Sequence, residues 1–552
     1  DIETTMTADK IWCIVCKHGD TYYQFKEDRL HRFAELIKQT DEVIGHNIIG
    51  FDIPVVNTIF GYDVFANCKV TDTLVLSRLL NPMIDGGHSL RNWGTKLGQN
   101  KIHFEQFDYF SEDMLTYCRN DVELTERLYK FLSSKTKDFG QSIELEHRVA
   151  QIIQKQHERG FKINVVEAYE LQSKFQEDMN DLTTKVRQTF PPLKIEEEFI
   201  PKSNNKSRGY VKGVPFIKVK YKEFNLGSRQ QIAERLVMLG WKPKKKTDKG
   251  HIIVDEKVLS QIHNIPEAKL INRYLMLQKR IAQVNSWIEA IKEDGRVHGK
   301  VITNGTITGR MSHQSPNMAQ IPAVYSPYGK ECRALWTVNK GYKLVGVDAS
   351  GLELRMLAHY MNDKDYTHEV VNGDIHTTNQ VAAGLGSRDE SKTFIYAFIY
   401  GAGSKKIGSI IGGSERDGER IKEKFLRATP SLRHLREKVE RIAQRRWVRG
   451  LDQRKIIIRY PHAALNTLLQ GAGATVMKYA LTLLDEYVKI KQIKAFPVVN
   501  VHDEFQYEVE EKRADEFGRL AVQSIVDAGK QLNVRCPLNG KYKIGNNWSE
   551  TH

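Results

Sequence analysis

The stretch Val347-Asp348-Ala349-Ser350-Gly351-Leu352-Glu353-Leu354-Arg355 decides the fold of this chain. The apolar run that leads into it predicts a buried strand with Asp348 at its tip. Far along the chain, a second apolar run at 496–501 leads into His502-Asp503-Glu504 and presents Asp503 in the same way. Mg²⁺ prefers oxygen ligands and is usually held by one or two carboxylates together with substrate phosphates. The two strand ends therefore predict a magnesium site, although either Asp alone also fits an ordinary strand that ends in an acidic turn.

A third motif lies between them, in the segment from Arg388 to Gly401. Four of its residues recur at every fourth position and so share one stripe of a helix; they are Arg388, Lys392, Tyr396 and Tyr400. Cations suit the phosphates of a nucleotide, and aromatic rings suit its base and sugar. Gly401 can end the helix and lets backbone pass close to a ligand. Taken alone, the stripe also fits an amphipathic surface helix.

The N-terminal third carries a separate set of acids. Asp1 and Glu3 stand at i and i+2 and therefore on one face of a strand, and Asp52 follows another apolar run. Tyr117 and Asp121 lie one helical turn apart. Four acids and a phenol can bind two magnesium ions and orient a water molecule, whereas any one acid alone would more commonly be a solvated loop residue. A strand that presents Asp1 should begin earlier, so we expect the native chain to be longer at this end.

The ordered motifs resemble the family A DNA polymerases, most of all the replicative polymerases of T7-like bacteriophages. Supporting stretches are Thr308-Gly309-Arg310, residues 372–377, residues 461–470 and Asn547-Trp548. The N-terminal acids and tyrosine resemble the three motifs of proofreading 3′–5′ exonucleases. The resemblance implies a multidomain chain of α/β and α+β class, in which a ribonuclease H-like exonuclease domain precedes a right-hand polymerase with palm, fingers and thumb.

The implied domains follow one another along the chain. They are the exonuclease domain (1–135), a connector and helical thumb (136–330) with a shortened basic insertion at about 191–223, the palm (331–358 and 467–552) and the fingers (359–466). Helical spacing of apolar residues predicts long thumb helices over 143–159, 165–190, 229–239 and 268–291.

The resemblance also assigns roles to residues. The predicted polymerase metal ligands are Asp348, the carbonyl of Ala349 and Asp503, and the predicted exonuclease ligands are Asp1, Glu3, Asp52 and Asp121. Each site should take two Mg²⁺ ions, for which Mn²⁺ can substitute. The catalytic set adds Glu504 and Lys392 for synthesis and Tyr117 for the exonuclease. The predicted dNTP contacts are Arg388, Lys392, His376, Tyr396, Glu353, Tyr400 and Gly401. Glu353 should exclude a ribose 2′-hydroxyl and bond to Tyr396.

Charge and composition favour a nucleic-acid partner. The chain has 83 basic against 68 acidic residues, a net charge of +15, and residues 1–130 carry −6 while the remainder carries +21. A basic body suits a phosphate backbone. By resemblance, Arg310 and Gln470 should contact the minor groove of the terminal base pair, and His462 and His502 should also contact DNA.

The segment 202–222 holds seven basic residues and no acid. In T7-like enzymes this region carries a long insertion that binds thioredoxin; here it is too short, so we predict no thioredoxin clamp. We expect a basic loop that contacts duplex phosphates through Lys212, Lys218, Lys220 and Lys222, and a second cluster, 242–246, can extend it. A solvated loop is the alternative.

The expected function is template-directed DNA synthesis with 3′–5′ proofreading, in phage genome replication. The expected partners are primer–template DNA and dNTPs, with a replicative helicase–primase and a single-stranded DNA-binding protein as candidates. No apolar stretch reaches the length of a membrane span, no signal peptide is present, and the six cysteines form no disulfide framework. We therefore expect the cytoplasm, that of the host if the chain is phage-encoded. A repair-type family A enzyme and a non-catalytic DNA-binding relative stay open as alternatives.

Overall fold

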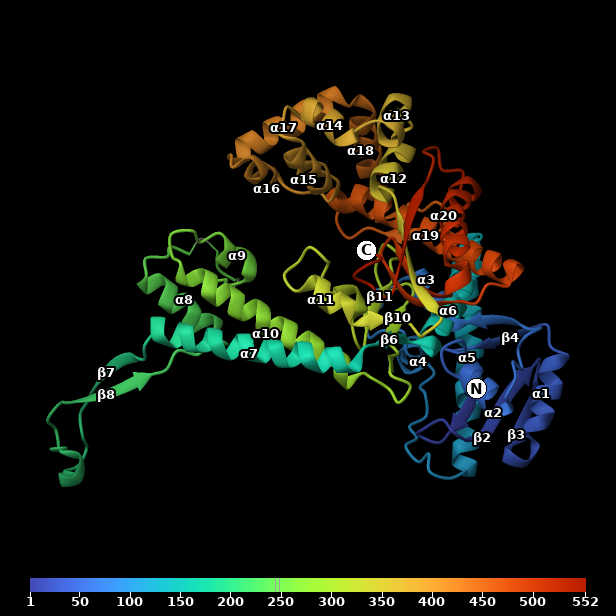
Figure 1. Cartoon of the computed structure of the whole chain (residues 1–552). Helices are drawn as coiled ribbons and strands as arrows, with labels where there is room; N and C mark the ends of the chain where they lie inside the picture. Colours follow the sequence, from blue (N-terminus) through green and yellow to red (C-terminus); the bar gives the residue numbers. More distant parts are fainter. Residues whose placement is uncertain (244, 248) are drawn as a thin grey trace. The chain divides into compact units, whose positions relative to one another are not determined.

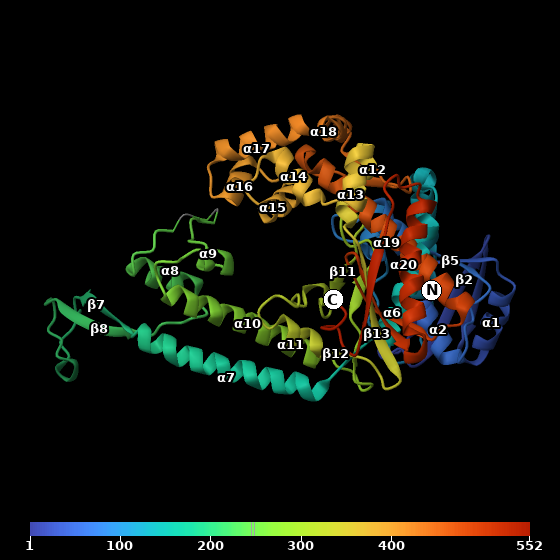
Figure 2. The ribbon, with the colours of Figure 1, turned by 45° about the horizontal axis from the view of Figure 1, so that its top comes forward.

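The computed structural model describes residues 1–552 except 244 and 248, so Lys244 of the second basic cluster lies outside the described residues. The chain forms two compact units: Asp1–Lys162 together with His298–His552, and Ile163–Val297. Within the first unit, Figures 1 and 2 show the helices of 364–443 gathered in one cluster and the N-terminal elements in another.

The N-terminal region mixes short strands with helices, as the sequence predicts. The apolar runs at Ile11–His18 and Glu42–Gly45 both form strands. The antiparallel sheet is β1 (Ile2–Thr4), β2 (Ile11–His18) and β3 (Thr21–Lys26), and the parallel pair is β4 (Glu42–Gly45) and β5 (Lys69–Asp72). The helices are α1 (Leu30–Lys38), α2 (Asp52–Phe60), α3 (Thr73–Leu80), α4 (Leu90–Leu97) and α5 (Glu112–Thr136).

A four-stranded antiparallel sheet carries both acidic strand ends of the polymerase motifs. Its strand order is β16 (Ala495–Val501), β17 (Glu504–Glu510), β13 (Tyr342–Ala349) and β18 (Gly540–Gly545). The register places Asp348 opposite Glu504. Three long helices pack with the sheet around one apolar core: α6 (Ser142–Arg159), α19 (Ala464–Lys491) and α20 (Ala514–Gln531).

A helical cluster follows the first acidic strand. Gly351, with φ of +58°, makes the left-handed turn that lets β13 pass directly into α12. The cluster consists of α12 (Leu352–Met361), α13 (Lys364–Asn372), α14 (Ile375–Ala383), α15 (Arg388–Ile399), α16 (Ser404–Gly408), α17 (Glu415–Ala428) and α18 (Pro430–Ala443). The predicted stripe of cations and tyrosines therefore lies on α15, and Tyr400 is its C-cap residue.

The second unit contains the predicted thumb helices. They are α7 (Val165–Thr189), α8 (Arg229–Met238), α9 (Glu256–Ser260) and α10 (Glu267–Glu289), and α7 and α10 lie side by side. The predicted basic loop at about 191–223 is wrong in part, because β7 (Leu193–Phe199) and β8 (Phe216–Lys222) pair as an antiparallel ribbon. Alternating aliphatic and aromatic residues in both segments favour strands over a solvated loop.

The first unit also contains β12 (Trp336–Thr337), further short strands and one short helix. They are β10 (Lys300–Ile302), β11 (Ser312–Gln314), α11 (Gly329–Ala334), β14 (Trp447–Arg449) and β15 (Lys455–Ile457). All six cysteines are free thiols. Among the described residues, no helix is both long and apolar enough to cross a membrane.

Candidate active sites

The two acids of the polymerase motifs end neighbouring segments of the sheet. Asp348 is the penultimate residue of β13, and Asp503 directly precedes β17. The Ala349 N–H donates to the carbonyl of Asp503 at 3.1 Å, which ties the two ends together. Burial, with the nearby charges of Asp503 and Glu504, raises the pKa of Asp348 to about 6. Burial also raises the pKa of Asp503. Carboxylates that resist ionisation in this way form a set that a bound cation would stabilise.

Glu504 differs from both, because protein groups already hold its carboxylate. It accepts hydrogen bonds from Trp548 Nε1 at 2.7 Å and Gln506 Nε2 at 2.6 Å, and His552 Nδ1 lies 2.8 Å from its second oxygen. Burial alone would raise the pKa of Glu504, but the bonds from His552 and Gln506 outweigh burial and lower it. Glu504 was predicted to support the metal site, but the sequence did not predict any of these three partners.

Glu353 lies at the start of α12 and is bonded to two residues of other motifs. The Tyr400 hydroxyl donates to both of its oxygens, at 2.7 and 2.8 Å, and Arg310 Nη2 donates at 3.0 Å. The expected bond to Tyr396 is therefore wrong for this structure. Tyr400 stands one helical turn further along α15, and it is the hydroxyl of this residue that reaches the carboxylate. The ring centroids of the two tyrosines lie 6.5 Å apart.

The predicted nucleotide helix begins with a capping box formed by Ser387 and Glu390. Arg388 lies in its first turn and donates two hydrogen bonds to Asp374, at 2.7 and 3.1 Å. Lys392 is exposed and has no ion pair or hydrogen bond among the described residues. A guanidinium that holds a planar anion with two parallel bonds has the geometry that also suits a phosphate.

His376 and Gly401 lie at the two ends of this region. The His376 ring lies 6.4 Å from the Tyr396 ring between centroids, and its Nδ1 is buried without a hydrogen-bond partner in the part of the chain described. Burial, together with Arg388, lowers the pKa of His376. Gly401 has φ of +74°, and a Cβ there would lie 3.1 Å from the carbonyl oxygen of His462, so a side chain would be strained at this position.

The predicted DNA contacts lie on different elements. His502 is exposed with φ of +55°, directly before Asp503, and Gln470 is half-buried on α19. The His462 ring stacks on Tyr460, with centroids 5.5 Å apart. Arg310 is the residue that bonds to Glu353.

The four predicted lysines lie in the second unit, on the ribbon and its connecting loop. Three of them already have a partner. Lys220 pairs with Glu197 at 2.7 Å, Lys222 lies 3.7 Å from Glu234, and the Lys218 ammonium lies 3.5 Å from the centre of the Phe199 ring. Strand β7 thus brings acids opposite the basic segment, which the local charge count alone does not reveal.

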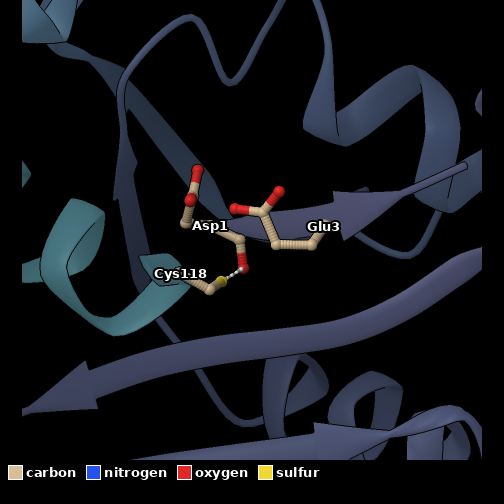
Figure 3. Close-up of side chains that lie close together, drawn as sticks. All are labelled: Asp1, Glu3 and Cys118. Atoms are coloured by element: carbon tan, nitrogen blue, oxygen red, sulfur yellow. Dashed lines mark hydrogen bonds between the residues drawn. The ribbon is translucent and has the colours of Figure 1, made fainter. Parts of the chain in front are cut away.

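The exonuclease motifs bring acids from three elements into one region. Asp1 and Glu3 come from β1 and its start, Asp52 begins α2, and Asp121 lies on α5. Figure 3 shows the carboxylates of Asp1 and Glu3 side by side, with the Cys118 thiol donating to the Asp1 carbonyl at 3.5 Å. Ligand atoms of these three residues all lie within 4.8 Å of one another.

Burial raises the pKa of Glu3, Asp52 and Asp121. It raises the pKa of Glu3 to about 8, with Asp121 as the next cause, and the pKa of Asp52 to about 6. Asp121 Oδ1 is buried and has no hydrogen-bond partner among the described residues. An all-carboxylate set with an open oxygen fits Mg²⁺. Cys118 does not fit as a ligand of Mg²⁺, because this cation prefers oxygen donors and the Cys118 thiol donates to the Asp1 carbonyl.

Tyr117 lies beside Asp121 in an aromatic setting. Its ring stacks on Phe104, with centroids 5.3 Å apart, and lies edge-on to Phe107. The ammonium of Lys101 lies 4.6 Å from the centre of the Tyr117 ring and 2.5 Å from Asp121 Oδ2. Sequence reasoning missed Lys101, because a single lysine in a polar loop carries no pattern.

The family model described as DNA polymerase family A matches residues 213–550. The chain belongs to the family A DNA polymerases. The polymerase is 32% identical to the DNA-directed DNA polymerase of Enterobacteria phage T3. The match covers 100% of this chain and 99% of the phage T3 polymerase. It is 34% identical to the DNA-directed DNA polymerase of Escherichia phage T7, with 88% of each chain covered. The predicted family and enzyme class are confirmed.

The fold of the polymerase is also confirmed. It matches the solved POL domain of Pol1 from M. smegmatis, described as a complex with DNA primer-template and dNTP, with a TM-score of 0.80 at 18% identity over 98% of this chain and 93% of that one. The alignment with the phage T3 polymerase spans 710 positions against 552 residues here, so that relative has residues that this polymerase lacks.

The polymerase also contains a buried ionic cluster that sequence reasoning missed. Glu146 of α6 is fully buried and accepts two bonds from Lys478 of α19, at 2.7 and 2.8 Å, while Arg454 Nη1 lies 2.6 Å away. Arg454 in turn pairs with Asp452, and Lys478 donates to Asn304. The cluster connects α6 with α19 and with the loop that leads to Arg310.

Proposed function

We propose that this polymerase extends a primer by two-metal nucleotidyl transfer at Asp348 and Asp503. The observation that carries the proposal is the pair of carboxylates at the ends of β13 and β17, which the bond from the Ala349 N–H to the Asp503 carbonyl ties together. With the Ala349 carbonyl they offer only oxygen donors, which suits Mg²⁺. When bound, the ions supply positive charge that activates the primer 3′-hydroxyl and offsets charge on the departing pyrophosphate.

The residues of α15 and its neighbours would then hold the triphosphate. Arg388 exchanges Asp374 for phosphate oxygens, because both anions accept the same paired bonds from the guanidinium. Lys392, exposed on the next turn, adds a second positive charge beside the leaving group. His376 can turn its unbonded Nδ1 toward the same phosphates. Tyr396 and Glu353 would face the sugar.

Primer–template DNA and dNTPs are the proposed ligands, in line with the description of the mycobacterial structure. The phage relatives support a role in phage genome replication in the host cytoplasm. A helicase–primase and a single-stranded DNA-binding protein would then be partners. A binding assay against a replicative helicase separates this role from that of a repair-type enzyme.

A primer-extension gel tests the polymerase site. Asp348→Ala and Asp503→Ala should abolish extension in Mg²⁺ while DNA binding persists, because the basic body of the chain holds the phosphates. Asp365→Ala, an exposed acid on α13, is the matched control and should extend normally. Extension by either site variant at the control's rate would refute the assignment.

We also propose a 3′–5′ exonuclease that proofreads. The supporting observation is that Glu3, Asp52 and Asp121 are all buried and that the charges of Asp121 and Asp52 both act on Glu3. Asp52→Ala or Asp121→Ala should stop the degradation of single-stranded 3′ ends and spare synthesis, whereas Asp113→Ala, exposed at the start of α5, should change neither. A site variant that lost both activities in parallel would contradict two separate sites.

A further inference from the structure

Lys101 is the one basic side chain that forms an ion pair with any of the four predicted exonuclease ligands, counted over the described residues. Its Nζ lies 2.5 Å from Asp121 Oδ2, and its side chain is 18% exposed against 4% for that of Asp121. The ammonium also faces the Tyr117 ring, 4.6 Å from its centre. It therefore contacts both the acid and the phenol that α5 contributes to the site.

The backbone around Lys101 is fixed on both sides. The Ile102 N–H donates to Asn120 Oδ1 of α5 at 3.1 Å, and Phe104 stacks on Tyr117. On the other side the chain packs on Gly94, where a Cβ would lie 2.5 Å from the Gln99 carbonyl oxygen. The contacts on both sides of Lys101 therefore fix its backbone, and its side chain extends toward Asp121.

The ammonium takes up only one oxygen of Asp121. The other, Oδ1, is buried and has no hydrogen-bond partner among the described residues. A divalent cation that binds there would lie close to the positive charge of Lys101. In a partly buried site such repulsion is screened far less than in water.

We propose that Lys101 is an internal counter-ion of the exonuclease site, which competes with divalent metal for Asp121 and so lowers the metal affinity of the DNA-free enzyme. The inference rests on the proposed exonuclease function. It makes Lys101 a positioning residue: it keeps the acids together without metal, and it must share or release Asp121 when metal binds. A purely structural tether would instead support metal binding.

Mn²⁺ binding to the full chain without DNA, followed by the loss of the free-ion electron paramagnetic resonance signal, tests the inference. The parent protein carries Asp348→Ala, which removes the polymerase metal site. Lys101→Met should lower the Mn²⁺ concentration for half-saturation by about tenfold, a size typical of changes to groups that hold metal ligands. Lys101→Arg, which keeps the charge, should leave it near the parent value. Lys96→Met, exposed on α4, controls for net charge.

Lys101→Gln gives a second route if Lys101→Met does not fold, because glutamine can still donate to Asp121 but carries no charge. It too should tighten Mn²⁺ binding. Unchanged or weaker binding in the folded neutral variants would overturn the counter-ion role. If the parent has no Mn²⁺ site that Asp52→Ala removes, the metal-dependent exonuclease itself fails, and the counter-ion role fails with it.

Discussion

The hydroxyl of Tyr400 donates hydrogen bonds to both carboxylate oxygens of Glu353, at 2.7 and 2.8 Å. Arg310 donates to the same carboxylate at 3.0 Å. Residues from three separate motifs thus meet at one anion. Because its partners come from different elements, the Glu353 side chain is fixed where the start of α12 and the end of α15 come together.

This relationship predicts that Tyr400 positions Glu353. Tyr400→Phe keeps the ring and removes the one hydroxyl proton that the two Glu353 oxygens share, a hydrogen bond to a charged group worth about 1.5–3 kcal/mol. If Glu353 excludes a ribose 2′-hydroxyl, discrimination against ribonucleotides should fall by about tenfold to a hundredfold. Competitive incorporation of dNTP against rNTP measures it. The effect should vanish in a Glu353→Gln background, and an equal loss there would mean that the two residues act separately.

The buried cluster around Glu146 should matter for stability. Glu146→Gln leaves the buried cations Lys478 and Arg454 poorly compensated, and breaking a buried pair costs about 3–5 kcal/mol. Urea unfolding followed by tryptophan fluorescence should show the loss. Glu144→Gln, exposed on the same helix, is the control and should change stability little. Equal midpoints for the two variants would argue that the cluster is not needed for stability.

Strand ends and helices could be predicted from the sequence because each is a local pattern. An apolar run followed by Asp348 or Asp503 identifies the strand that ends there, and the four-residue period identifies α15. Partners brought together by tertiary contacts could not be predicted. The pairing of Asp348 with Glu504 joins distant segments, and the choice of Tyr400 over Tyr396 depends on how α15 approaches α12.

Isolated charges were missed for the same reason. Lys101 and Glu146 belong to no motif, and only the fold shows that each lies against opposite charges. At the ribbon of β7 and β8, the sequence overstated the positive charge. The segment 202–222 is basic by count, but strand pairing sets Glu196, Glu197 and Glu198 opposite it.

The acids of the proposed exonuclease site predict a pH dependence. The pKa of Glu3 is raised from 4.5 to about 8, so the folded, metal-free protein holds this proton more tightly than the unfolded chain does. This contribution to stability is present at low pH and declines as pH rises from 4.5 to about 8.

Metal binding requires the carboxylate form of Glu3, so it should release a proton at pH 7 and almost none at pH 9. Calorimetry in buffers of different ionisation enthalpy measures the release in an Asp348→Ala protein. Glu3→Gln should abolish the difference between the two pH values.

The ribbon lysines predict a salt effect. Each phosphate contact contributes about 0.9 to the slope of log affinity against log salt on duplex DNA. Neutralising Lys212, Lys218, Lys220 and Lys222 together should flatten that slope, and thioredoxin should change product length little. Changing the facing acids Glu196, Glu197 and Glu198 to glutamine is the matched control and should strengthen binding. An unchanged slope would favour a solvated ribbon, and a large gain in product length with thioredoxin would refute the prediction of a chain without that clamp.

The last prediction concerns Tyr396, whose hydroxyl has no hydrogen bond among the described residues and whose pKa is raised by burial and by the charge of Glu353. In the family that this chain resembles, a phenol at this position can replace contacts that a missing 3′-hydroxyl on the incoming sugar would make. We therefore expect ready acceptance of dideoxynucleotides.

Tyr396→Phe keeps the ring beside His376 and removes one hydrogen-bonding group, worth about 1.5–3 kcal/mol when a charged group takes part. Discrimination against the dideoxy substrate should rise by about tenfold to a hundredfold, with normal dNTP incorporation nearly unchanged. Competitive incorporation of dNTP against ddNTP measures this, with Tyr366→Phe, a buried tyrosine on α13, as the control. Equal ratios in the Tyr396→Phe variant and the parent would mean that Tyr396 does not face the sugar.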